Sequence, residues 1–279
     1  MTSAPRVAFQ GEAGAFSEAA ARRVFGGDVI TVPCPTFAGI AEQVLAGDAG
    51  YGMLPVENSI AGGVGGGYDV LSTGRLAVVG EVVEPIGLCV LGVPGAGLAE
   101  VRRVLSHPVA LAQCQRFLDG LVEADALAVH DTAGAARLVA ERGDRATVAV
   151  AGRFAAELYG LAVLAEDVQD RPDNQTRFFV VAAPGTPPPP ASAFGSPRTA
   201  LLFSTAHRPG ALSDVLAPLA AAGINLSRIE SRPADAPWHY NFFLELDADL
   251  ADPVVATAVE QASRAARSLT VLGSFRRMG

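Results

Sequence analysis

Residues 6–25, RVAFQGEAGAFSEAAARRVF, place an apolar run, a glycine-rich turn and a helix-forming run in direct succession. The first five residues predict a strand, and residues 17–25 predict a helix. The same succession of short Val/Ile/Leu-rich strands and helices recurs as far as residue 170. Such alternation is typical of parallel or mixed sheets flanked by helices. The sequence therefore predicts an α/β fold in which ~180 residues form two lobes with a cleft between them.

Periodicity and turn residues assign most elements of this region. The expected helices cover 17–25, 36–47, 131–143 and 153–160, and the expected strands cover 6–10, 51–58, 76–93, 146–152 and 161–170. Two stretches lack a clear helix or strand periodicity. The glycine-rich run at 60–67 is expected to be a loop, and residues 101–120 are expected to hold a loop and a helix.

A proline-rich stretch, PGTPPPPASAFGSPR at 184–198, divides the chain. Six of its fifteen residues are proline, which favours an extended spacer because proline lacks the N–H donor that helices and sheets need. We therefore expect a large domain over 1–183, a linker over 184–198 and a second domain, the tail, over 199–279. In that last domain the pattern predicts the order βαββαβ, which is the ferredoxin-like arrangement.

The chain is acidic, with a formal net charge of −8 and no cluster of Lys and Arg. This balance disfavours nucleic acid and anionic membrane surfaces as partners. The three cysteines are widely spaced, which predicts free thiols and no metal site. The first ten residues are too polar for a signal peptide, and no apolar run reaches the ~18 residues of a membrane span. We expect a soluble, cytoplasmic protein.

Polar or glycine-rich stretches stand at five junctions between strands and helices. They are GEAGAFS (11–17), PVENS (55–59), SHPVALAQC (106–114), HD (130–131) and NQTRF (174–178). Each has an ordinary explanation as a glycine turn, a mobile loop, a capping histidine or a helix N-cap. Together they predict a cleft of hydroxyls, amides and the guanidinium of Arg177, suited to a carboxylate. The backbone N–H groups of Gly11 and Gly14 are expected to meet a ligand.

These stretches, in this order, resemble those of the monofunctional prephenate dehydratases. In the tail, residues 210–233, GALSDVLAPLAAAGINLSRIESRP, resemble the ACT regulatory domain that binds phenylalanine. Together the two resemblances cover nearly the whole chain. The resemblance implies that 1–183 is the catalytic domain, with two lobes like those of type II periplasmic binding proteins. It also implies decarboxylative dehydration of prephenate to phenylpyruvate, feedback regulation by L-phenylalanine, and a homo-oligomer formed partly through ACT domains. Neither a cofactor nor a metal is expected, because aromatisation of the ring drives the reaction.

The resemblance assigns roles to particular residues. The catalytic positions fall on Thr176, Glu57 and Asp131, and the substrate-binding positions fall on Asn58, Ser59, Ser106, Gln113, Arg177 and Phe178. We expect the Thr176 hydroxyl to be the immediate hydrogen-bond donor to the departing oxygen. Because a hydroxyl has a high pKa, water or the carboxyl group of Glu57 or Asp131 is expected to supply the proton.

The phenylalanine site is expected at the start of the first helix of the tail. There the backbone N–H groups of Gly210 and Ala211 are expected to meet a carboxylate. The full predicted set is Gly210, Ala211, Leu212, Asn225, Leu226, Glu230, Ser231, Arg232 and Pro233. Two alternatives stay open for the whole protein. One is an arogenate dehydratase, and the other is a regulator that binds an anionic metabolite without catalysis.

Overall fold

The computed structural model describes residues 4–189, 195–234 and 236–278. The chain forms two compact units. The first unit comprises the residues up to Gly65 together with Val83–Phe178, and the second comprises Gly66–Val82 together with the residues from Phe179 onward. The predicted linker 184–198 lies partly outside the described residues, because 190–194 belong to the gap between them.

The first sheet of the first unit is built around β1 (Arg6–Gln10), which pairs in parallel with β2 (Ile30–Cys34) and with β3 (Tyr51–Asn58). The helices α1 (Phe16–Phe25) and α2 (Phe37–Ala46) pack against these strands. The centre of β1 has no exposed surface, as expected for a central strand covered on both faces. The predicted strand–turn–helix unit at 6–25 is thus confirmed.

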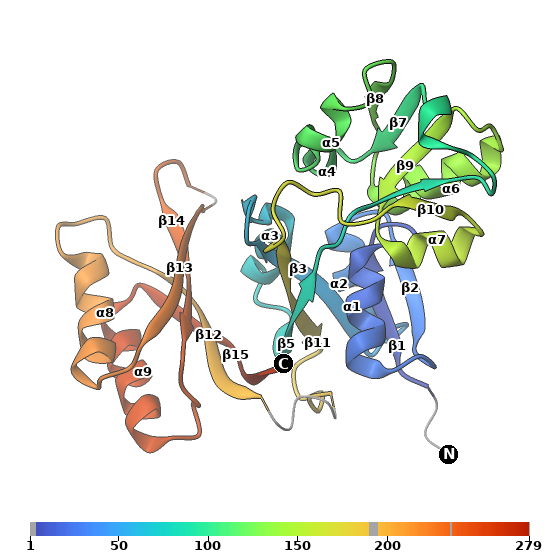
Figure 1. Ribbon diagram of the computed structural model, residues 1–279. Coiled ribbons are helices and arrows are strands. Elements are labelled where there is room, and N and C mark those ends of the chain that lie inside the picture. The colour runs from blue at the N-terminus through green and yellow to red at the C-terminus, as the bar shows by residue number, and fades with distance from the viewer. Residues whose placement is uncertain (1–3, 190–194, 235, 279) are drawn as a thin grey trace. The chain divides into compact units, whose positions relative to one another are not determined.

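The second sheet of the first unit has the strand order β10-β6-β9-β7-β8. Its strands are β6 (Cys89–Gly92), β7 (Arg103–Ser106), β8 (Asp125–Ala128), β9 (Thr147–Ala151) and β10 (Ala162–Ala165). A short 3-10 helix covers Leu98–Glu100, and the α-helices are α4 (Pro108–Ala112), α5 (Gln115–Asp119), α6 (Thr132–Arg142) and α7 (Arg153–Tyr159). Figure 1 shows this sheet with its helices in green and yellow-green.

Alternate residues of the second sheet serve two different hydrophobic clusters. Val148 and Val150 of β9 pack with residues of α4, whereas Ala149 and Ala151 pack with residues of α6 and α7. Side chains alternate between the faces of a strand, so helices on both faces produce two cores. With two sheets that each carry their own helices, the predicted α/β fold with two lobes is confirmed.

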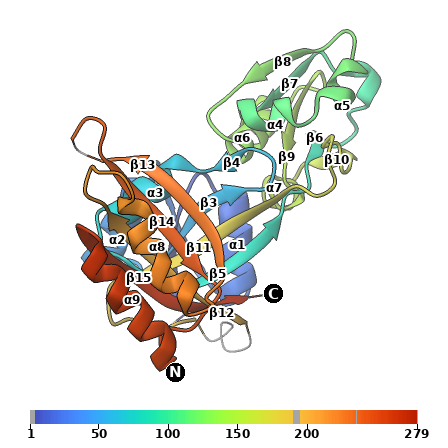
Figure 2. The same cartoon turned by 90° about the vertical axis from the view of Figure 1, so that its left-hand side faces the viewer.

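The second unit contains a four-stranded antiparallel sheet in the order β13-β14-β12-β15. Its elements are β12 (Ser196–Ser204), α8 (Ala211–Ala221), β13 (Leu226–Pro233), β14 (Tyr240–Leu246), α9 (Pro253–Ala265) and β15 (Ser268–Met278). The expected βαββαβ order is confirmed. Both helices lie side by side on one face of this sheet (Figure 2).

The opposite face of that sheet is covered by a segment from the N-terminal half of the chain. The helix α3 (Gly65–Ser72) packs Tyr68, which is 1% exposed, against Phe243 of β14 with 4.7 Å between ring centroids. The guanidinium of Arg228 lies 5.3 Å from the Tyr68 ring centroid. The compact unit therefore contains residues 66–82 besides the tail, whereas the boundaries 1–183, 184–198 and 199–279 stay a prediction.

Several elements differ from the sequence expectations. The glycine-rich run is not a loop, because β4 (Gly62–Gly63) pairs with the end of β3 and α3 begins at Gly65. Glycine disfavours helices, but burial of Tyr68 and Leu71 overrides this local preference. The strands β2, β7 and β8 were also not expected. Two more strands, β5 (Ala77–Pro85) and β11 (Gln175–Ala182), contribute residues to both units.

Candidate active site

Three side-chain amides from distant parts of the first unit form a closed ring of hydrogen bonds. Asn58 Nδ2 donates to Asn174 Oδ1 at 2.8 Å, and Asn174 Nδ2 donates to Gln113 Oε1 at 3.0 Å. Gln113 Nε2 lies 3.5 Å from Asn58 Oδ1 and completes the ring. Asn58 ends β3, Gln113 follows α4, and Asn174 precedes β11. The amide ring thus joins both lobes of the first unit.

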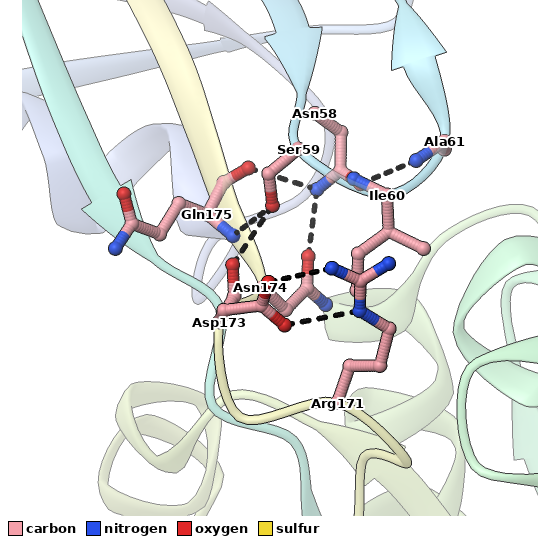
Figure 3. A network of polar contacts seen from close by, with 8 residues as sticks. All are labelled: Asn58, Ser59, Ile60, Ala61, Arg171, Asp173, Asn174 and Gln175. Carbon is pink, nitrogen blue, oxygen red and sulfur yellow. Dashed lines mark hydrogen bonds and ion pairs between the residues drawn. The ribbon is translucent and has the colours of Figure 1, made fainter.

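The orientation of Asn58 follows from its backbone neighbours. The N–H groups of Ile60 and Ala61 donate to Asn58 Oδ1 at 3.0 and 2.9 Å (Figure 3). A backbone N–H cannot accept, so the oxygen of this amide must face these two residues. Its nitrogen consequently faces Thr176 and donates to the hydroxyl oxygen at 3.0 Å. Because that oxygen accepts from Asn58, the Thr176 proton remains directed elsewhere.

Ser59 fastens the turn after β3 to the segment before β11. Its hydroxyl donates to the Asp173 carbonyl at 2.9 Å and accepts from the Gln175 N–H at 3.0 Å. The Ser59 N–H also donates to the Gln175 carbonyl at 2.8 Å. Figure 3 shows these contacts beside the exposed Arg171–Asp173 ion pair. The structure thus gives Ser59 protein partners, and its expected substrate contact stays a prediction.

Glu57 and Arg177 pair with each other beside this cluster. Arg177 Nη1 lies 2.8 Å from Glu57 Oε2, and their side chains are 16% and 32% exposed. Successive side chains of a strand point to opposite faces. Because Asn58 meets Thr176 on one face, the Glu57–Arg177 pair lies on the other. The pair therefore lies away from the contact between Asn58 and Thr176, and the expected roles of Glu57 and Arg177 stay predictions.

Two other predicted substrate contacts are buried. Ser106 is fully buried, and its hydroxyl donates to the Val150 carbonyl of the neighbouring strand at 2.5 Å. Phe178 is 2% exposed and continues β11 into the core. Thr176, at 8%, keeps some access to solvent. The structure therefore brings Asn58, Gln113 and Thr176 together, and it places Ser106 inside the second sheet.

Asp131 lies at a different hollow of the first unit, a cavity of about 480 Å³. Its lining consists of Gly11, Glu12, Ala13, Pro33, Cys34, Pro35, His130, Asp131, Arg137 and Tyr159. Asp131 Oδ1 caps α6 by accepting from the Gly134 N–H, whereas buried Oδ2 accepts no hydrogen bond from the described residues. A buried acceptor in this state is suited to a ligand hydroxyl or a water molecule.

The same cavity contains an ion pair between the lobes that sequence reasoning missed. Both guanidinium nitrogens Nε and Nη2 of Arg137 donate to Glu12, at 2.5 and 3.1 Å. The hydrogen bonds from Arg137 lower the pKa of Glu12. The only local signal was Glu12 in the glycine turn at 11–17, and nothing in the sequence pointed to its partner 125 residues away.

The glycine turn does not offer the N–H groups expected of it. The Gly11 N–H donates to the Cys34 carbonyl at 3.0 Å, and the Gly14 N–H donates to Glu18 Oε2 at 2.8 Å. Glu18 is 2% exposed and also binds Arg22 and Thr31. The turn is therefore held by the protein itself, and the expected anion contact is wrong for these two N–H groups.

The tail carries a cavity of about 400 Å³ beside the start of α8. Of the predicted effector residues it is lined by Ala211 and Leu212; the other lining residues are Thr205, Ala206, His207, Arg208, Pro209, Trp238, His239, Tyr240 and Phe242. Gly210 adopts a left-handed φ of 79°, which favours glycine. The Ala211 N–H donates to the Arg208 carbonyl at 3.3 Å, so only part of the predicted N–H pair is available.

The remaining predicted effector residues lie along β13 or just before it. Asn225 donates to Asp247 at 2.6 Å, and Glu230 lies 3.3 Å from Arg228. Arg232 lies 3.4 Å from Asp69 of α3. Leu226 packs at the margin of the core beneath α8 and α9, Ser231 is exposed opposite Phe242, and Pro233 ends the strand opposite Tyr240. Because Phe242 and Tyr240 line the cavity, their pairing with Ser231 and Pro233 brings the end of β13 next to it.

Comparison with known proteins supports both domains. Residues 7–186 match the prephenate dehydratase family, and residues 199–264 match the ACT domain family. The chain is 38% identical over 271 residues to a bifunctional chorismate mutase/prephenate dehydratase of Neisseria gonorrhoeae, covering 96% of this chain and 74% of that one. It is 39% identical over 271 residues to a bifunctional N-acyl-homoserine lactone acylase/prephenate dehydratase of Komagataeibacter europaeus, covering 96% and 95%.

A solved structure agrees with these relatives. The chain is similar to a prephenate dehydratase from Arthrobacter aurescens in complex with L-Phe, with a TM-score of 0.89 and 35% identity over 98% of this chain and 90% of that one. Among the described residues, no helix is both long and apolar enough to cross a membrane. The family matches span most of the chain and follow the order of its two expected domains. This chain therefore belongs to the prephenate dehydratase family of lyases and carries an ACT domain.

Proposed function

We propose that this protein converts prephenate to phenylpyruvate, carbon dioxide and water, and that hydroxide leaves beside Thr176. The observation that carries this assignment is the hydrogen bond from Asn58 to the Thr176 oxygen. An oxygen that already accepts a hydrogen bond can direct its own O–H toward a ligand. Thr176 therefore donates to the departing oxygen of the substrate.

The reaction needs few groups because the ring becomes aromatic. The bond from the ring to its carboxylate breaks, the electron pair moves through the ring, and the carbon–oxygen bond at the opposite ring position breaks. The departing oxygen takes this second electron pair and one proton, and it leaves as water. Positioning and a fixed donor supply much of the catalysis in such a fragmentation. Thr176 stabilises the charge that develops on the oxygen.

Asp131 is the better of the two candidate carboxyl groups for supplying the proton. Glu57 is paired with Arg177 on the face away from the hydroxyl, whereas Asp131 Oδ2 is buried and accepts no bond from the described residues. The cavity at Asp131 also contains His130, whereas the guanidinium of Arg137 is already bound to Glu12 and Glu141. We assign the acid role to Asp131, acting through water, because Asp131 lines a different hollow from Thr176.

An assay for phenylpyruvate with purified protein tests this function. The wild-type protein is expected to turn over prephenate, and Thr176→Val is expected to lower kcat by about 10²–10³-fold, as for loss of one fixed donor. Arogenate differs from prephenate only at the side-chain keto or amino group, so kcat/KM for the two substrates decides between them. Binding of prephenate without turnover would favour the non-catalytic regulator instead.

A second candidate activity comes from the relative named as an acylase, which the chain matches over 95% of that relative's length. Acyl transfer by a side-chain nucleophile needs a base within hydrogen-bond reach. Among the described residues the cysteines are buried, Ser106 binds the Val150 carbonyl, and Thr176 accepts from an amide. We therefore rank the lyase first, and an assay for release of homoserine lactone tests the acylase.

L-Phenylalanine is proposed as the effector of the ACT domain, in the cavity beside the start of α8. Aromatic side chains Trp238, Tyr240 and Phe242 line it and suit an aromatic amino acid. The strand β13 is at the edge of its sheet, and pairing two such edges would form a homo-oligomer. Calorimetry with phenylalanine, and light scattering with and without it, test these two statements.

A further inference from the structure

The residue that holds the amide ring together is Asn174. It is 2% exposed, although asparagine is mostly found at protein surfaces. Its carbonyl oxygen accepts the shortest of the three ring bonds, and its amide nitrogen donates to Gln113. Its backbone carbonyl accepts from the Ile86 N–H at 2.9 Å, which fixes the main chain. Burying an amide costs free energy unless its donors and acceptors form hydrogen bonds, so the three contacts of Asn174 are needed to keep it inside the protein.

The hydrogen bonds of the amide ring can run in one direction only, because the donor and acceptor ends of each amide are fixed. Ile60 and Ala61 force the oxygen of Asn58 toward the turn, so Asn58 presents its nitrogen to both Asn174 and Thr176. Asn174 must then present its oxygen to Asn58 and its nitrogen to Gln113. Any reversal at Asn174 would set two donors or two acceptors against each other. The position of the Asn58 nitrogen is therefore held from one side by Asn174.

This nitrogen has more acceptors than hydrogens. Its acceptors are Asn174 Oδ1 at 2.8 Å, Thr176 Oγ1 at 3.0 Å and the Gln175 carbonyl at 3.2 Å. If Asn174 no longer accepts, Ile60 and Ala61 still hold the Asn58 oxygen, but the Asn58 nitrogen loses its shortest hydrogen bond and is free to shift toward the Gln175 carbonyl. Thr176 then loses a fixed donor, and its hydroxyl is free to rotate. The direction of the Thr176 proton thus depends on a residue that does not touch it.

We propose that Asn174 is a positioning residue for the reaction, which holds the Asn58 amide against Thr176 and thereby aims the Thr176 proton at the departing oxygen. This inference rests on the proposed function of Thr176. It differs from that proposal because it concerns a residue that acts only through Asn58. Misplacement of a reacting group by about 1 Å is enough to lower a rate by about 10²-fold, so the expected effect is large.

Two substitutions separate positioning from packing. Asn174→Asp keeps the shape and the acceptor toward Asn58, whereas Asn174→Leu has a similar volume and no acceptor. Positioning predicts that kcat falls by about 10²-fold in the Leu variant, with a smaller fall in the Asp variant and little change in KM. A role in packing predicts the reverse order, since a buried leucine is tolerated better than a buried carboxylate.

A double-mutant cycle tests whether Asn174 acts through Thr176. In a Thr176→Val background, Asn174→Leu is expected to lower kcat no further, because there is no hydroxyl left to aim. Thr147→Val is the matched control; Thr147 is also fully buried and donates to Asp144 at 3.0 Å, but it lies in β9. It is expected to lower the melting temperature and leave kcat unchanged.

The outcomes distinguish this inference from the proposed function. A wild-type protein without turnover of prephenate overturns the function itself. A wild-type protein with turnover whose Asn174→Leu variant is folded and keeps its kcat overturns the positioning role alone. Additive losses in the double variant also overturn it, because they show that Asn174 acts independently of Thr176.

Discussion

Arg277 of β15 forms an ion pair with Glu81 of β5, with 3.1 Å between Nε and Oε1. The two residues are also partners in the register of a parallel pair of strands. Glu81 is 1% exposed, so its carboxylate is held inside the second unit. The last strand of the tail is therefore bound to a segment, residues 66–82, that sequence reasoning assigned to the catalytic domain. The aromatic contact between Tyr68 and Phe243 also joins residues 66–82 to the tail.

Arg277→Met is expected to destabilise the protein measurably. Removing one partner of a buried ion pair costs about 3–5 kcal/mol, and the 35% exposure of the Arg277 side chain reduces the expected cost to roughly 1–2 kcal/mol. Urea unfolding measures the loss. Arg276→Met is the matched control, because its ion pair with Asp249 spans 3.9 Å between exposed side chains. Equal stability losses in the two variants would show that Glu81 does not depend on Arg277.

Arg177→Lys is expected to lower the melting temperature, because lysine keeps the charge but not the planar group that meets Glu57. Glu57→Gln is expected to cause a similar decrease. If Arg177 and Glu57 stabilise each other, the melting temperature of the double variant falls by less than the sum of the two single decreases. A normal melting temperature together with a raised KM for prephenate in Arg177→Lys would instead assign Arg177 to the substrate.

Stability is expected to rise with pH through the range just below 6.5 because of His107. Burial lowers the pKa of this imidazole, an effect that His130 strengthens and Asp131 opposes. His107 Nδ1 accepts from the Val109 N–H at 3.2 Å and caps α4, which requires an unprotonated nitrogen. Between the lowered pKa and the unfolded value the unfolded chain binds more protons, so stability is present above about 6.5 and is lost below.

Unfolding in urea at pH 7.5 and pH 5.5 measures this dependence. His107→Asn keeps a side chain that caps helices but removes the titration, so the difference between the two pH values is expected to shrink. His239→Gln is the control, because His239 lies in the tail and is only partly buried. An unchanged pH dependence in His107→Asn would assign the effect to other groups.

Trp238 is expected to report phenylalanine binding. It is the single tryptophan of the chain, it is 80% exposed, and it lines the cavity beside α8. A ligand ring in that cavity would remove water from the indole and shift its emission to shorter wavelength. Titration with L-phenylalanine is expected to give a saturable shift, and Leu212→Glu is expected to weaken it. A saturable inhibition of turnover without any shift would place the effector elsewhere.

The expected elements were accurate where local pattern is strong. The strand at 6–10, the strand at 51–58 and the βαββαβ order of the tail follow from periodicity, which depends on neighbouring residues alone. The helix at Gly65–Ser72 could not be predicted in this way, because its glycines disfavour a helix and its support comes from Phe243, far along the chain. The β8 strand was missed because its side chains are all exposed and lack alternation.

The two α/β lobes, the ACT tail and the place of Thr176 among polar residues at the entrance to a strand could be predicted from the amino-acid sequence. The partner that each of these polar groups takes depends on the fold. Asn58 and Asn174 are 116 residues apart, and Gln113 lies between them in the chain, so no local pattern links the three. A hydrogen bond requires a donor and an acceptor within about 3 Å, and folding alone creates that proximity. For the same reason, only the fold revealed that Arg177 binds Glu57 and that the Thr176 oxygen accepts a hydrogen bond from Asn58.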